Sequence, residues 1–254
     1  MSSQVQSKKL AGKVALVTGG SRGIGAAIAR ALAENGADVA ISYVSSPEKA
    51  NALASELQSG GSRAAAFMAD QADAAQVEGL VKVVAAHFGR LDILVNSAGV
   101  YAGGPVDSPS ADVAALARQN AINYTGVVAA IRAAARVMGE GGRIITVGSG
   151  IASRVGFPGV ADYAATKAAV VGYSKGAARD LAPRKITVNV LQPGSIATDM
   201  NPDAGDFAAL QKSLIALGRF GTAQEVAAGV VFLASPEASY VTGTVLNVDG
   251  GYGA

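Results

Sequence analysis

The sequence predicts an α/β fold built on one doubly wound parallel sheet of about seven strands, with helices on both faces. Short β-branched runs alternate with longer alanine-rich stretches of helical character along the chain. Several of the short runs are apolar at successive positions, which is typical of strands covered by helices on both sides. With 254 residues, half of them hydrophobic, the chain suits one domain with a large core, expected over residues 11–254.

Seven runs are predicted as strands, at residues 13–18, 38–43, 63–69, 91–96, 143–148, 186–191 and 244–249. After the second of them, Ser46 and Pro47 form an N-cap and a first helical turn, and Gly60 and Gly61 end that helix. Long helices are expected over residues 108–138 and 161–182. Residues 195–221 read as an irregular loop with its own short amphipathic helix, and we expect this loop to act as a substrate lid.

Composition excludes several classes of function. The 21 basic and 19 acidic residues give a net charge of +2, so no nucleic-acid partner is indicated. With no Cys and one His, disulfides, thiol chemistry and the common zinc sites are excluded, and no metal is expected. No apolar run reaches the length of a membrane span, and the polar residues 1–10 lack the apolar core of a signal peptide. We therefore expect no membrane partner, a disordered lead at residues 1–10 and a cytoplasmic location.

A glycine-rich loop follows the first predicted strand and opens into a helix, as in Rossmann-type dinucleotide sites. Gly19 permits a tight turn, Gly23 lets the backbone approach a pyrophosphate, and Gly25 allows close packing of helix on strand. The glycine spacing differs from the usual Gly-x-Gly-x-x-Gly, and an ordinary turn is the alternative reading. The cofactor-binding candidates in this loop are Gly19, Ser21, Arg22, Gly23, Ile24 and Gly25.

The end of the second strand favours NADP(H) over NAD(H). Sites for the unphosphorylated cofactor carry an acid there to bind the ribose 2′-hydroxyl, whereas this chain has no carboxylate before Glu48. The Arg22 guanidinium matches phosphate geometry, and Tyr43, Ser45 and Ser46 complete the candidate site. The alternative is that Arg22 is merely solvated.

Tyr163 and Lys167 lie four positions apart on a predicted helix, so the phenol and the ammonium share one face. A nearby cation favours phenolate and so lowers a pKa that is ordinarily near 10. Such a pair also occurs by chance on many helices. Ser149 adds weight because it follows a strand at the carboxyl end of the sheet, where ligands bind, although a simple turn is the alternative.

Six motifs in order make the chain resemble the short-chain dehydrogenase/reductase family over nearly its whole length. They are TGGSRGIG (18–25), NSAG (96–99), NYTG (123–126), Ser149, YAATK (163–167) and PGSIATDM (193–200). The C-terminal VTGTVLNVDGGY makes it similar to the 3-oxoacyl-acyl carrier protein reductase-like branch.

The resemblance implies a catalytic tetrad of Tyr163 as acid-base, Lys167, Ser149 and Asn123. In it, Lys167 lowers the pKa of Tyr163 and binds the nicotinamide ribose, Ser149 orients the carbonyl, and Asn123 holds a water of the proton relay. It also implies that the cofactor contacts Tyr163 and Lys167 together with Asp70, Asn96, Ala98, Gly99, Pro193, Gly194, Ile196 and Thr198. A homotetramer is implied too, with the long helices and the C-terminal strand as interfaces.

Two features depart from the family pattern. The interval from Ser149 to Tyr163 is one residue longer than the common spacing, so the loop between them is expected to bulge beside the substrate pocket, where Phe157 and Pro158 are candidates to line it or to pack. Basic surface for a carrier protein is sparse: the tip before the fifth strand carries Glu140, and only Arg184 and Lys185 look suitable.

The sequence thus predicts an NADPH-dependent reductase of a ketone, reversible as an alcohol dehydrogenase, with a small free ketone or alcohol as substrate. The alternatives are an NAD-dependent alcohol dehydrogenase, a 3-oxoacyl-acyl carrier protein reductase, and a cofactor sensor without catalysis. The identity of the substrate and the stereochemistry lie outside what the motifs specify.

Overall fold

A computed structural model describes residues 8–254, and its centre is one seven-stranded parallel sheet in the order β3-β2-β1-β4-β5-β6-β7. The strands are β1 (Val14–Thr18), β2 (Asp38–Tyr43), β3 (Ala64–Met68), β4 (Ile93–Asn96), β5 (Arg143–Val147), β6 (Thr187–Pro193) and β7 (Val245–Val248). All seven predicted strands are present, and no end differs from its predicted position by more than two residues. Strands β1, β4 and β6 are buried along their whole length, which explains their unbroken apolar runs. The predicted doubly wound sheet is confirmed.

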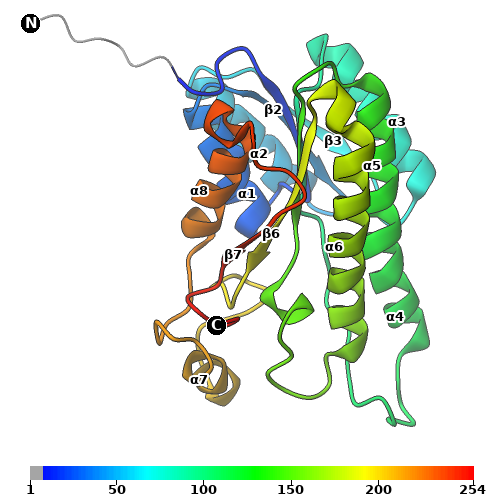
Figure 1. Ribbon diagram of the computed structural model, residues 1–254, viewed down its shortest axis with the longest axis vertical. Helices are drawn as coiled ribbons and strands as arrows, with labels where there is room; N and C mark the ends of the chain where they lie inside the picture. The colour runs from blue at the N-terminus through cyan, green and yellow to red at the C-terminus, as the bar shows by residue number, and fades with distance from the viewer. Residues whose placement is uncertain (1–7) are drawn as a thin grey trace, which may run out of the picture.

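Helices cover both faces of the sheet (Figure 1). One face is covered by α1 (Gly23–Glu34), α2 (Pro47–Ser59) and α8 (Ala223–Ala234), whose apolar residues join one core cluster. The other is covered by α3 (Ala74–Phe88), α5 (Gly126–Val137) and α6 (Ala161–Leu181), which form a second cluster, with the shorter α4 (Val113–Asn120) beside them. The two clusters lie on opposite sides of the sheet, so the sheet is buried between two layers.

The order of the strands places a ligand crevice at the carboxyl edge of the sheet. From β1 the chain winds outward through β2 to β3, and then returns to place β4 on the other side of β1. Loops after β1 and β4 leave the sheet toward opposite faces at this switch point, and such a crevice is where open α/β sheets bind ligands. The glycine loop follows β1, and Ser97 to Gly99 follow β4, as the sequence predicts.

The prediction of one helix over residues 108–138 is wrong in two respects, which concern where the helix begins and whether it is continuous. It begins at Val113, where Asp112 caps it by accepting from the Ala115 amide at 2.9 Å. It is also interrupted by a π-helical turn at Ala121–Thr125, which separates α4 from α5. Helix α6 ends within one residue of its predicted bounds.

The predicted disordered lead at residues 1–10 is wrong at its C-terminal end. Residues 1–7 of the predicted lead lie outside the described residues. At its other end, Leu10 is 1% exposed and donates its amide to Asn35, so the ordered chain begins before residue 11. In the part of the chain that the structure describes, no helix is both long and apolar enough to cross a bilayer.

The segment over residues 195–221 forms a small unit at the carboxyl edge. Its helix α7 (Asp206–Ser213) lies close to the C-terminus of the chain in Figure 1. The two ends of the segment pair as a bridge between Ile196 and Gly221. Beneath α7, a separate apolar cluster joins Ala208, Ile215 and Phe220 to the C-terminal Tyr252.

Candidate active site

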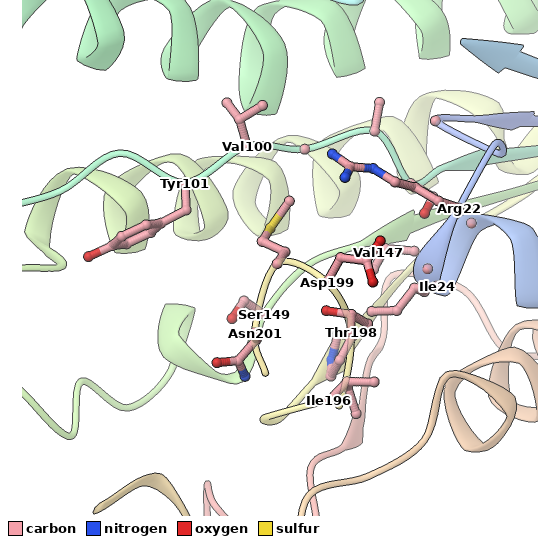
Figure 2. Close-up of a pocket in the computed structure, with 18 of the residues that line it drawn as sticks. Arg22, Ile24, Val100, Tyr101, Val147, Ser149, Ile196, Thr198, Asp199 and Asn201 are labelled. Carbon is pink, nitrogen blue, oxygen red and sulfur yellow. The ribbon is translucent and has the colours of Figure 1, made fainter. Parts of the chain in front are cut away.

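A pocket of about 730 Å³ lies at the carboxyl edge of the sheet and collects most of the predicted site residues. Figure 2 shows Arg22, from the glycine loop, and Tyr101, from the loop after β4, at opposite sides of this pocket. The walls come from the ends of β1, β2, β4, β5 and β6 and from the 195–221 segment. One continuous cavity thus runs from the glycine loop past Ser149 and Tyr163 to α7.

The glycine loop has the geometry of a dinucleotide cradle. Gly19 adopts a positive φ of 65°, and a Cβ on Gly25 would lie 2.3 Å from the Gly19 carbonyl oxygen, so only glycine fits there. Arg22 is the N-cap of α1 but makes no side-chain cap hydrogen bond, which leaves the first amides of the helix facing the pocket. The loop therefore fits a pyrophosphate, whose negative charge a helix N-terminus stabilises.

The end of β2 contributes hydroxyls and no carboxylate to the cavity. Tyr43, Ser45 and Ser46 line the same pocket as Arg22, so a guanidinium and three hydroxyl groups border one region. On the far side, Asp70 accepts from Arg118 of α4, at 3.1 and 3.2 Å for its two oxygens. This part of the pocket fits a ribose phosphate next to a heterocycle.

Tyr163 lies in the pocket with Ser149 and Lys167. Burial raises the pKa of Tyr163 to about 12, and a hydrogen bond with Ser149 opposes that rise. The Lys167 ammonium lies 5.7 Å from the centre of the Tyr163 ring. Burial lowers the pKa of Lys167 to about 8. In this arrangement desolvation outweighs the expected effect of Lys167 on the pKa of Tyr163.

Lys167, which lines the pocket, and Asn123, which lies behind its wall, meet at Gly99. The Lys167 Nζ donates to the Val147 carbonyl at 3.1 Å. A Cβ on Gly99 would lie 3.5 Å from the Asn123 Oδ1 and 3.6 Å from that Nζ, so both groups face the same small space. The Asn123 side chain makes three hydrogen bonds: its Oδ1 accepts from the Val100 amide, and its Nδ2 donates to the Val100 carbonyl and to Thr166.

The π-turn explains how Asn123 reaches this position. The turn widens the helix at residues 121–125, and its closing Gly126 amide bonds to the Ala121 carbonyl five residues back. A Cβ on Gly126 would lie 2.0 Å from the Gln71 carbonyl oxygen, so close packing on the loop after β3 requires glycine here. Single π-turns inside α-helices are often found at functional sites.

Two predicted residues do not border the pocket. Asn96 is 1% exposed and its Nδ2 donates to Thr146 at 3.2 Å, so its side chain links β4 to β5 inside the sheet. Asn123 lies behind the wall, as described above. The other predicted cofactor and catalytic residues all line the cavity, and so does Phe157, whereas Pro158 does not.

Sequence reasoning missed Tyr101, Phe207 and Tyr252, which also line the pocket. Tyr101 packs edge-on against Tyr163, with ring centres 5.4 Å apart, and Phe157 packs against Phe207 of α7 at 5.2 Å. Tyr252 donates its hydroxyl to the Arg154 carbonyl and accepts from the Gly156 amide, which anchors the long loop before α6. No local pattern in the sequence marks these contacts, since they join segments far apart in the chain.

A dinucleotide cradle and a Ser-Tyr-Lys group in one cavity define a nicotinamide-type oxidoreductase. Residues 19–253 match the family described as enoyl-(acyl carrier protein) reductase. The chain belongs to the short-chain dehydrogenase/reductase family, in the branch similar to 3-oxoacyl-acyl carrier protein reductases.

Relatives of this chain carry different names. The 3-oxoacyl-[acyl-carrier-protein] reductase of Staphylococcus aureus is 43% identical over 244 residues, covering 94% of this chain and 97% of that protein. The cyclic-di-GMP-binding biofilm dispersal mediator protein of Escherichia coli is 44% identical over 243 residues, covering 96% and 98%. A short-chain dehydrogenase of Burkholderia cenocepacia, solved in complex with NADP, has a TM-score of 0.94 at 49% identity and covers 97% of this chain and 100% of its own.

Proposed function

We propose that the protein is an NADPH-dependent carbonyl reductase, which transfers hydride reversibly between NADP(H) and a small ketone or its secondary alcohol. The observation that carries the proposal is that Ser149, Tyr163 and Lys167 line the same pocket as the dinucleotide cradle. The bound nicotinamide supplies the hydride, and the protein supplies positioning and the proton.

Four side chains orient the substrate and supply the proton. The Ser149 hydroxyl hydrogen-bonds the carbonyl oxygen of the substrate, and Tyr163 gives that oxygen its proton. A phenol with a pKa of about 12 is protonated at neutral pH, so it is ready to donate in the direction of reduction. Lys167 places a positive charge near the ring, and its ammonium binds the nicotinamide ribose. Asn123, whose Oδ1 faces the same small space as the Lys167 Nζ, holds the water of the proton relay.

The preference for NADPH rests on Arg22 and the end of β2. A carboxylate there would repel a 2′-phosphate, and the pocket presents only hydroxyls from Tyr43, Ser45 and Ser46. A guanidinium binds phosphate strongly through paired, charge-assisted hydrogen bonds. The structural neighbour from Burkholderia cenocepacia was solved with NADP, which supports the same preference.

A 3-oxoacyl-acyl carrier protein reductase is the alternative that the relatives' names favour. The two basic residues suited to a carrier protein are engaged within this chain. Arg184 donates to the Ala135 and Met138 carbonyls and so closes the C-terminal end of α5. Lys185 pairs with Glu140 at 2.5 Å. These contacts favour a free ketone over a carrier-bound thioester.

We also propose a homotetramer, with α4, α5, α6 and the C-terminal strand at its interfaces. Val113 of α4 is 73% exposed, and Tyr240, just before β7, is fully exposed. Large apolar side chains so exposed on these elements suit burial between subunits. Sedimentation at the mass of a monomer would contradict this assembly.

The first experiment follows absorbance at 340 nm with NADPH and with NADH, against small ketones, 3-oxoesters, and free and carrier-bound 3-oxoacyl thioesters. We expect a higher kcat/KM with NADPH and with a free ketone. Tyr163→Phe should lose about 100-fold or more in kcat, because it removes the proton donor. Tyr173→Phe is the matched control on the same helix. If neither cofactor is consumed with any substrate, the proposed function is wrong.

The cofactor preference has its own pair of variants. Arg22→Ala should lower kcat/KM with NADPH by about 10- to 100-fold, the loss expected for charge-assisted hydrogen bonds, and leave NADH unchanged. Arg30→Ala, on the same helix α1 but paired with Glu56, should change neither. An equal loss with both cofactors in Arg22→Ala would show that Arg22 does not read the 2′-phosphate.

A further inference from the structure

Gln211 of α7 is a buried glutamine whose amide oxygen and amide nitrogen both form hydrogen bonds. It is 6% exposed and lines the pocket. Its Oε1 accepts from the Ser195 hydroxyl at 2.6 Å and from the Asn201 Nδ2 at 3.1 Å, and its Nε2 donates to the Asn201 Oδ1 at 3.0 Å. The two amides therefore form a reciprocal pair, to which a hydroxyl is added.

These bonds fix both ends of the wall next to the catalytic residues. Ser195 and Asn201 bound the stretch at residues 195–201, and Ile196 and Thr198, which lie between them, line the pocket. Thr198 and Asn201 also exchange backbone hydrogen bonds. Figure 2 shows Ile196, Thr198 and Asn201 along this wall, with Ser149 in the same pocket. One side chain on α7 thus bonds to both ends of this wall, which is also paired with Gly221 through the bridge at Ile196.

Other contacts of α7 do not replace this link. Ala208 holds one face of the helix against the cluster beneath it, while Phe207 and Leu210 are about half exposed. Within the described residues, every hydrogen bond between α7 and the 195–201 stretch passes through Gln211. Loss of this amide would leave the wall joined to α7 by apolar packing and the backbone alone.

We propose that Gln211 is a positioning residue, which holds the 195–201 wall in the geometry needed for substrate and cofactor and keeps α7 closed over them. The inference rests on the proposed function for its kinetic readout. The proposal requires that residue 211 accept and donate hydrogen bonds at the same time. A neutral amide does both, and so does a protonated carboxyl, but a carboxylate only accepts.

This requirement gives a test by pH. In Gln211→Glu, an ionised carboxylate places an oxygen against the Asn201 Oδ1, and either orientation of Asn201 leaves one mismatch. We expect kcat/KM for the ketone to be about tenfold below the wild type at pH 8, in line with one unsatisfied buried polar contact. At pH 6, burial favours the protonated carboxyl, and the ratio to wild type should recover to within about threefold.

Two control variants, and the use of a ratio to the wild type, keep the result specific to the amide. Gln211→Leu cannot donate at any pH, so its loss should be the same at pH 6 and pH 8. Gln224→Glu makes the identical change at an exposed position of α8 and should match the wild type. The charged groups on α7 and in the segment before it, which are Asp199, Asp203, Asp206 and Lys212, are the same in every variant, so each variant is compared with the wild type at the same pH. An equal loss in Gln211→Glu at both pH values would overturn the proposal.

A second readout does not depend on turnover. Chymotrypsin cleavage after Phe207 or Leu210 at pH 8 should be several-fold faster in Gln211→Glu than in Gln224→Glu, because α7 detaches more often. If the wild type reduces no ketone but this difference is present, the proposed function fails and the positioning role stands. If cleavage rates are equal and kcat/KM is unchanged, Gln211 does not hold the wall.

Discussion

Two groups with shifted pKa values, the buried Lys167 and the half-buried Tyr163, line the same pocket. Burial disfavours the charged form of each, so it raises the pKa of Tyr163 to about 12 and lowers that of Lys167 to about 8. The neutral phenol suits proton donation, and the ammonium of Lys167 persists only below about pH 8. As pH rises, Lys167 loses its proton before Tyr163 does. We therefore expect Lys167 to set the alkaline limit of the reduction rate.

The alkaline side of the rate profile tests this order. Below about pH 8, Lys167 is charged and Tyr163 protonated, so kcat/KM for carbonyl reduction should be flat; above it, the rate should fall as Lys167 loses its proton. A stopped-flow or steady-state profile from pH 6 to pH 11 measures it. Lys167→Ala should be slow and lack this fall. A wild-type profile that stays flat to pH 10 would instead assign the fall in rate at alkaline pH to Tyr163.

At the scale of elements, the strands were predictable and one helix was not. Each strand carries its own signal, because a buried parallel strand reads as a short apolar run between turns. The interruption at Ala121–Thr125 has no such signal, since it depends on Gly126 packing against the Gln71 backbone from another loop. The role of Gln211 could not be predicted either, because the fold of the segment brings its partners Ser195 and Asn201 to it. Asn96 matches its motif, yet the structure places its side chain inside the sheet.

The π-turn gives a prediction about stability. Gly126→Ala places a methyl group 2.0 Å from the Gln71 carbonyl oxygen, so the backbone must shift, at a cost of about 1–3 kcal/mol typical of overpacking. Gly79→Ala is the matched control: it lies within α3 with no atom within 4 Å of the added Cβ, and should gain up to about 1 kcal/mol in helix propensity. Thermal unfolding at equal protein concentration measures both. Equal midpoints for the two variants would contradict the packing argument.

For the whole molecule, the buried Lys167 lowers the stability of the fold. A pKa that falls from 10.5 to about 8 on folding means that the native state pays a penalty for the charge at neutral pH. One pKa unit corresponds to about 1.4 kcal/mol, so the shift corresponds to roughly 3 kcal/mol below pH 8. Between pH 8 and 10.5 the unfolded chain binds the proton more tightly, and the penalty from this group should diminish as pH rises.

Lys167→Met keeps the apolar stem and removes the charge, so it should be more stable than the wild type at pH 7 while catalysis is lost. The hydrogen bond from Lys167 to the Val147 carbonyl is lost as well, which offsets about 1 kcal/mol of the gain. Unfolding midpoints of both proteins at pH 7 and pH 9.5 test the claim, and the advantage of the variant should shrink at the higher pH. Lys175→Met, which makes the same change at an exposed position of α6, should show neither effect. A variant less stable than the wild type at pH 7 would mean that Lys167 is solvated in the native protein, and the expected fall in rate above pH 8 would then lose its basis.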